Sequence, residues 1–178
     1  MPIPANIGAV RELLEGRRFG FAPRPLFGHI AIGLGVAITL LDLMAWFGWG
    51  VRDTNGFVVA AWWLAIATVV IAALAAFMSL VESSDAADAD RPLARLDLIA
   101  AFGATLLYLI TAGLRSQDLG GAGAAPLDVL SAAAGLIVLA VDGVIGATLY
   151  ASREWEVPDE DEYEPRRHHR DRVARARS

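Results

Sequence analysis

Ionisable side chains stand inside long apolar stretches of this sequence, where an isolated charge is costly. Three aspartates lie there, Asp42, Asp97 and Asp142, together with one histidine, His29. Such residues in a lipid-spanning helix usually face a neighbouring helix or a cavity, and they can pair, carry protons or line a ligand site. The chemistry open to them is therefore structural pairing, proton handling or ligand binding.

His29 is the residue with the clearest cofactor chemistry. A neutral imidazole in a membrane helix bundle can ligate haem b, or it can lie beside a quinone. A strong haem signal needs a second ligand on a facing helix, but His168 and His169 lie in a charged tail, and only Met78 has a suitable depth. We predict no bound cofactor, with haem b or quinone at His29 as the alternative.

Catalytic motifs are absent from the sequence. It contains no phosphate-binding loop, no HExxH motif and no nucleophile elbow. It has no cysteine, which excludes thiolate-ligated zinc and cysteine-held iron–sulfur clusters within the chain. We predict that the protein is not an enzyme, has no catalytic or metal-binding residue and binds no nucleic acid.

Four apolar stretches must position the ionisable residues. The chain has 178 residues, of which 56% are hydrophobic, and a bilayer crossing needs about 20 apolar residues. Pro25, Pro92 and Pro126 stand near the starts of three stretches, where a missing backbone N–H is harmless. The sequence therefore predicts an all-α integral membrane four-helix bundle over residues 26–151, with helices at 26–48, 57–81, 93–114 and 127–151.

Arginines are distributed unevenly about these stretches. If the four stretches cross a membrane in turn, only Arg52 and Arg115 fall on the side reached after the first and third stretches. All the other arginines fall on the opposite side, before the first stretch, after the second or after the fourth. Positive residues favour the cytoplasmic face, so both termini and the 82–92 connection are predicted to be cytoplasmic. Residues 1–25 then form a cytoplasmic or interfacial segment. Residues 152–178 form a polar charged tail, and we expect its 158–178 part to bind a partner subunit or the membrane surface.

Small residues share a helix face with two of the buried acids. At about 100° per residue, such faces occur on the first and fourth stretches. They comprise Gly28, Ala31, Gly35 and Asp42 on the first, and Ser131, Gly135, Asp142 and Gly146 on the fourth. Small residues let helices approach closely. We therefore predict that Gly35 and Gly135 lie at helix–helix contacts.

Depth along each helix, counted at about 1.5 Å per residue from its start, groups the polar residues. Asp42 and Tyr108 fall at similar depths in the outer half. We predict that Tyr108 donates a hydrogen bond to Asp42 and that this pair has a structural role, with Thr111 or Arg115 as alternative donors.

A second polar layer is predicted near the cytoplasmic end of the bundle. Its members share a short distance from that end; they are His29, Ser79, Glu82, Asp97 and Asp142. The acids can serve packing through hydrogen bonds or pairing, or they can line a proton or ligand path.

Four segments carry a family pattern. They are RPLFGHIAIGLGVAITLLDL, with His29 and Asp42, then AALAAFMSLVE, LLYLITAGLR and DGVIGATLYASREWEV. Over about residues 20–157 the chain resembles a family of bacterial four-helix membrane proteins catalogued as domain of unknown function 2231. The pattern departs at Arg24 and Asp97, which stand where the family has histidine, and at Ala31, which replaces a proline. A multi-histidine haem or metal site is therefore not implied by the resemblance.

The resemblance implies a bacterial cytoplasmic membrane protein with several spans and no settled activity. Some relatives carry a Rieske-type domain, so the resemblance also implies association with electron transfer. This chain lacks the cysteines of such a domain.

Three functional hypotheses are compatible with these features. The first is a non-catalytic accessory or structural subunit of a larger bacterial inner-membrane complex, in energy-transducing or electron-transfer machinery. Such a subunit would contact lipid and partner proteins. The second is a redox module that uses His29 to hold haem b or quinone. The third is a small proton-linked transporter, which is the weakest because the four stretches show no inverted repeat.

Overall fold

The computed structural model describes residues 23–50, 54–84 and 90–154, and all regular structure in these ranges is helical. Four helices occur in the order α2 (Pro23–Trp46), α3 (Gly56–Ser84), α4 (Arg91–Arg115) and α5 (Pro126–Glu154). Helices α3, α4 and α5 cover the predicted stretches and extend them by one to three residues at each end, whereas α2 begins three residues earlier than predicted and ends at Trp46, two residues before the predicted end. Most of the predicted N-terminal segment, and the tail from residue 155, lie outside the described residues.

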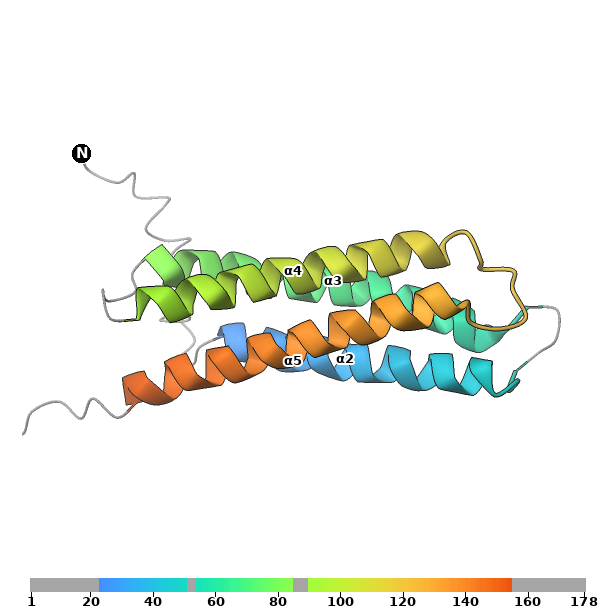
Figure 1. Ribbon diagram of the computed structural model, residues 1–178, viewed down its shortest axis with the longest axis horizontal. Coiled ribbons are helices and arrows are strands. Elements are labelled where there is room, and N and C mark those ends of the chain that lie inside the picture. The colour runs from blue at the N-terminus through green and yellow to red at the C-terminus, as the bar shows by residue number, and fades with distance from the viewer. Residues whose placement is uncertain (1–22, 51–53, 85–89, 155–178) are drawn as a thin grey trace, which may run out of the picture.

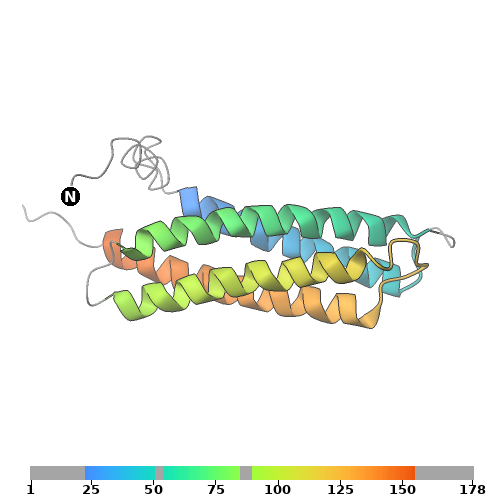
Figure 2. The same cartoon turned by 90° about the horizontal axis from the view of Figure 1, so that it is seen from above.

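The helices form one antiparallel bundle (Figures 1 and 2). Helix α2 packs against α3 and α5, and α4 packs against the same two neighbours. Helices α2 and α4 therefore run parallel to each other and face one another across the centre of the bundle. The starts of α2 and α4 lie at one end, here called the Pro23 end. The opposite end, where α2 finishes, is called the Trp46 end.

The residues that face the centre of the bundle recur along each helix at alternating spacings of three and four residues. In α4 the buried positions on this face are Ala94, Asp97, Ala101, Ala104, Tyr108, Thr111 and Arg115. This spacing averages 3.5 residues, the repeat of helices that coil around one another in a left-handed bundle. Alanine also dominates the buried face of α3. Small inward side chains let the helices approach closely, which is how helices pack within a membrane.

Large apolar side chains point out of the bundle. Ile99 and Val144 are each 68% exposed, and Leu40 is 56% exposed. A soluble protein places its large aliphatic residues inside, whereas here the small residues are inside and the large ones face the surroundings. Each of the four helices is long and apolar enough to cross a membrane. The chain thus has the make-up of a multi-pass membrane protein.

Asn55 joins the two connections at the Trp46 end. Its Nδ2 donates to the carbonyl oxygens of Trp49 at 2.8 Å and Ala122 at 3.1 Å, and its Oδ1 accepts from the Phe57 N–H at 3.0 Å. The last bond satisfies one of the free amide groups at the start of α3. Gly50 lies beside this side chain with a φ of +111°, a conformation that favours glycine. The α2–α3 connection is therefore anchored to the α4–α5 connection.

Candidate functional site

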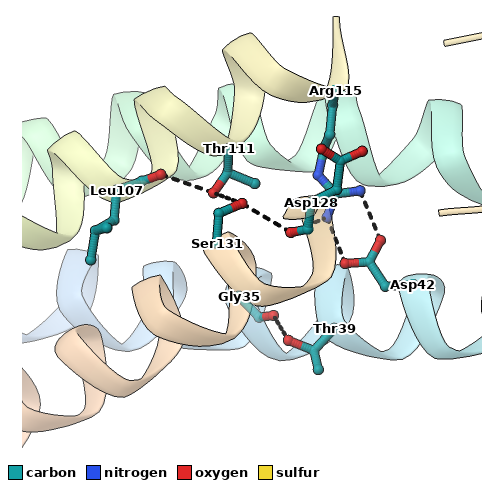
Figure 3. Close-up of polar contacts among 8 residues, drawn as sticks. All are labelled: Gly35, Thr39, Asp42, Leu107, Thr111, Arg115, Asp128 and Ser131. Atoms are coloured by element: carbon teal, nitrogen blue, oxygen red, sulfur yellow. Dashed lines mark hydrogen bonds and ion pairs between the residues drawn. The ribbon is translucent and has the colours of Figure 1, made fainter. Parts of the chain in front are cut away.

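A buried ion pair links α2 to α4 near the Trp46 end (Figure 3). Arg115 donates from Nη1 to Asp42 Oδ1 at 2.7 Å and from Nη2 to Asp42 Oδ2 at 2.5 Å. Nη2 also lies 3.3 Å from the carbonyl oxygen of Asp128 at the start of α5. Arg115 is 0% exposed and Asp42 is 1% exposed. Two parallel hydrogen bonds between charged groups fix orientation as well as energy, so three helices are held together here.

Asp42 was predicted to accept a hydrogen bond from Tyr108, and that prediction is wrong. Its partner is Arg115, which was considered only as an alternative. The cause is an offset between helix starts. Helix α4 begins six residues before Asp97, whereas α2 begins one residue before Arg24, which lies opposite Asp97. Two residues at the same number of positions from the starts of α2 and α4 therefore differ by about 7 Å along the bundle axis. Arg115, which lies nearer the end of α4 than Tyr108, is consequently the residue level with Asp42.

Hydroxyl groups extend this arrangement along α4 and α5. Thr111 Oγ1 lies 3.0 Å from Ser131 Oγ, and Ser131 Oγ donates to the Asp128 carbonyl oxygen at 3.0 Å (Figure 3). Together with Asp42 and Arg115 these residues make up the Arg115 cluster. Asp128 Oδ2 and Arg115 Nε are buried without a hydrogen-bond partner among the described residues. The cluster thus brings opposite charges together where three helices meet.

A second cluster lies at the Pro23 end. Arg24 donates from Nη2 to Asp97 Oδ1, and Asp97 Oδ2 accepts from Ser79 Oγ at 2.5 Å. Arg24 also lies within ion-pair distance of Asp142, at 3.7 Å, and of Glu82, at 3.9 Å. These five residues form the Arg24 cluster, which joins all four helices.

Four of the five residues predicted for the second polar layer meet in the Arg24 cluster. Arg24 was predicted to lie in the segment before the first helix, but it lies inside α2 and is only 5% exposed. Spacing could have identified it. Arg24 and Asp42 are 18 residues apart, and so are Asp97 and Arg115. Eighteen residues make five helical turns, so each helix presents its acid and its arginine on one face.

The two ion pairs consequently mirror one another. Helix α2 supplies arginine at the Pro23 end and aspartate at the Trp46 end, whereas α4 supplies aspartate and then arginine. In each ion pair the two partners are 73 residues apart in sequence. This arrangement fixes the register of α2 and α4, which face each other diagonally and make little other contact.

Tyr108 fills the middle of the bundle between the clusters. Its ring faces Gly35 on α2 and Gly135 on α5. A Cβ atom at Gly135 would lie 2.8 Å from Tyr108 Cε2, and one at Gly35 would overlap the Tyr108 hydroxyl. Both glycines thus lie at helix contacts, and both are needed to admit this ring. The Tyr108 hydroxyl itself is buried and has no hydrogen-bond partner among the described residues.

His29 is not a member of the Arg24 cluster, although it lines a pocket together with Arg24 and Asp142. It is exposed, and its Nδ1 lies 2.5 Å from the carbonyl oxygen of Pro25. It borders a cavity of about 280 Å³ between α2 and α5, called here the α2–α5 pocket. The pocket is lined by Arg24, Pro25, Gly28, His29, Ile32, Ala75, Asp142, Gly143, Gly146 and Ala147. It presents one imidazole and no methionine sulfur, so it offers a haem at most one axial ligand of these types.

Metal binding finds no support in the described ranges, where no group of three or more histidine, aspartate or glutamate side chains could hold an ion.

No protein-family model matches the chain, and no match is found among curated proteins or solved structures. Function is therefore inferred from the two clusters, the layer between them and the α2–α5 pocket.

Proposed function

We propose that the protein is a non-catalytic integral subunit of a larger bacterial inner-membrane complex, in energy-transducing or electron-transfer machinery. The observation that supports this proposal is the pairing of its buried charges. Arg115 holds Asp42 at one end of the bundle, and Arg24 holds Asp97 at the other. Groups that are bound to each other in this way stabilise a helix arrangement, and they are poorly placed to accept a passing substrate or proton.

The layer between the clusters also favours a structural role. Ile38, Tyr108 and Leu139 belong to one buried core, together with alanines from all four helices. This apolar layer separates the two polar clusters along the axis. A proton-linked transporter needs ionisable groups or water-lined cavities that connect the two sides. The transporter hypothesis is therefore the less supported one.

The outer surface and the charged tail remain as the parts that can contact partners. Large aliphatic side chains cover the outside of the bundle, and lipid or other membrane helices can pack against them. The resemblance to bacterial four-helix membrane proteins supplies the remaining elements of the proposal, namely the bacterial cytoplasmic membrane and the link to electron transfer. The predicted docking role of residues 158–178 belongs to the same proposal.

Native electrophoresis can test the subunit assignment. Membranes from cells that encode the protein would be solubilised in digitonin, with a tag at the N-terminus of the chain. We expect the chain to migrate within one discrete assembly, and we expect its deletion to lower the abundance of the other subunits of that assembly. A chain truncated after residue 157 is the matched variant, and it should keep the bundle but associate more weakly. A chain that always migrates alone, with no complex altered by its deletion, would overturn the proposal.

A further inference from the structure

An outward-facing stripe of α4 carries two arginines at the Pro23 end. Arg91 and Arg95 are both exposed, and Arg95 makes no hydrogen bond or ion pair with the residues that the structure describes. Phe102 and Leu109 follow Arg95 at intervals of seven residues and are 43% and 55% exposed. Spacings of four and seven return a helix to nearly the same face. The stripe is therefore positively charged at one end and apolar along its length.

The apolar part of the stripe borders α3, which packs alongside α4 (Figure 2). Phe102 meets Phe77 of α3 edge to face, with the ring centroids 6.4 Å apart, and both rings are exposed. Two helices thus contribute adjacent aromatic side chains to one outer surface, next to the two arginines along the axis. This surface, called here the α3–α4 face, consists of Phe77, Arg91, Arg95 and Phe102.

The length of the apolar stripe places Arg95 at a bilayer boundary. The exposed residues of α4 between Arg95 and Ser116 are aliphatic, aromatic or glycine, and Ser116 is again polar. The rise from Arg95 to Ser116 is about 31 Å along the helix, and the hydrocarbon core of a bilayer is about 30 Å thick. Arg95 therefore lies level with the headgroups of one leaflet when the apolar part of α4 spans the hydrocarbon.

Charge favours a phosphate as the group that meets these arginines. The acids Glu82 and Asp97 lie near this end of the bundle, but Arg24 engages both of them in the interior. A guanidinium can donate two parallel hydrogen bonds to a phosphate. Lipid phosphates surround a membrane-spanning bundle at this level, whereas a partner helix would need an acid placed at the same depth. An anionic lipid is the better occupant because a zwitterionic headgroup carries its own cation.

We propose that the α3–α4 face binds one anionic phospholipid, with its phosphate on Arg95 and Arg91. One acyl chain lies across Phe102 and Phe77, and Phe102 is about 10 Å from Arg95 along the helix. Basic sites at the ends of membrane helices hold anionic headgroups in this way. The proposal concerns binding alone and does not depend on the subunit assignment, because it can be tested on the purified chain.

Native mass spectrometry of the full-length protein, released from a non-ionic detergent, counts the bound lipids directly. Short-chain phosphatidylglycerol would be titrated beside phosphatidylcholine of the same chain length. We expect one phosphatidylglycerol to bind saturably and about fivefold or more tightly than phosphatidylcholine. Arg95→Gln should remove most of this preference, and Arg95→Lys should keep most of it because lysine also binds phosphate. Both variants should unfold at the wild-type temperature, since Arg95 is exposed.

Two matched controls separate this site from general attraction to lipid. Adding Gln117→Arg to Arg95→Gln restores the net charge at the opposite end of α4, where Gln117 is exposed, and should not restore the preference. Phe102→Ala should weaken phosphatidylglycerol binding, whereas Leu109→Ala should not, because Leu109 is about 21 Å from Arg95 and beyond a short chain.

Four results would each overturn the proposal. They are equal affinity for the two lipids, wild-type preference in Arg95→Gln, recovery of the preference through Gln117→Arg, and equal effects of the two alanine variants.

Discussion

Arg115 donates two hydrogen bonds to Asp42 across the diagonal of the bundle, at 2.7 and 2.5 Å, and both side chains are buried. The pair joins the two helices that otherwise make little contact. Removing one member of a buried ion pair leaves the other charge uncompensated. The stability of the whole bundle should therefore depend on this pair.

Asp42→Asn should lower the free energy of unfolding by about 3–5 kcal/mol, because Arg115 would keep its charge without a counter-ion. If Tyr108 were the partner of Asp42, the amide oxygen of asparagine could accept its hydrogen bond, and Asp42→Asn would change the stability little. The double substitution Asp42→Leu with Arg115→Leu should cost less than the sum of the single substitutions. Unfolding in mixed micelles with increasing denaturing detergent measures these differences. Wild-type stability in Asp42→Asn would contradict the assignment.

Ser79 should matter more than its neighbour Ser83 on α3. Ser79 Oγ donates to Asp97 at 2.5 Å inside the Arg24 cluster, whereas Ser83 Oγ donates to the carbonyl oxygen of Leu80 near the helix end. Ser79→Ala should lower the free energy of unfolding by about 1–3 kcal/mol. Ser83→Ala should change it by less than about 0.5 kcal/mol. The same unfolding measurement compares the two alanine variants, and equal losses would argue against the Arg24 cluster as a stabilising unit.

Alanine at Gly35 or Gly135 should destabilise the bundle, and Tyr108→Phe should rescue only one of the two variants. At Gly35 the new methyl group meets the tyrosine hydroxyl, which phenylalanine lacks. At Gly135 it meets ring carbons, which phenylalanine keeps. Each alanine should cost about 1–3 kcal/mol through overpacking.

Tyr108→Phe alone should be neutral or stabilising, since the hydroxyl is buried without a partner. Gly33→Ala is the control, as its Cβ meets open space. Rescue of both glycine variants by Tyr108→Phe, or of neither, would contradict the placement of this ring.

Cysteine labelling can establish the orientation of the bundle. Gln117 and Ser84 are both exposed and lie at opposite ends of it. The arginine distribution predicts that the Pro23 end is cytoplasmic, so a membrane-impermeant maleimide added to intact spheroplasts should label Gln117→Cys. It should label Ser84→Cys only after permeabilisation. The reverse labelling pattern would invert the orientation.

Helix number and type could be predicted from the sequence because they depend on local properties. Four apolar stretches of sufficient length leave few alternatives in a membrane. The glycines facing Tyr108 could also be predicted, since a stripe of small residues marks a close contact. The observed helix boundaries differ from the predicted ones by only a few residues, and this difference changes no contact by itself.

The partner of Asp42 could not be predicted by counting depth from each helix start. That method assumes that all helices begin at the same level along the bundle axis. Helix α4 instead begins about 7 Å further from the Arg24–Asp97 pair than α2 does. Arg24 was missed because it stands beside two prolines at the edge of an apolar stretch, where arginine usually faces the headgroups. Its burial depends on three acids brought from other helices, which are distant in sequence.

Reconstitution into liposomes tests most directly whether the buried charges serve the fold alone. Purified protein would be placed in liposomes that contain a pH-sensitive dye, and a potassium gradient with valinomycin would set an inward driving force for protons. We predict that the internal pH changes no faster than in protein-free liposomes, since an apolar layer separates the Arg24 and Arg115 clusters. Faster acidification that Asp97→Asn or Asp142→Asn abolishes, with the fold intact, would show that these acids carry protons and would contradict the structural role.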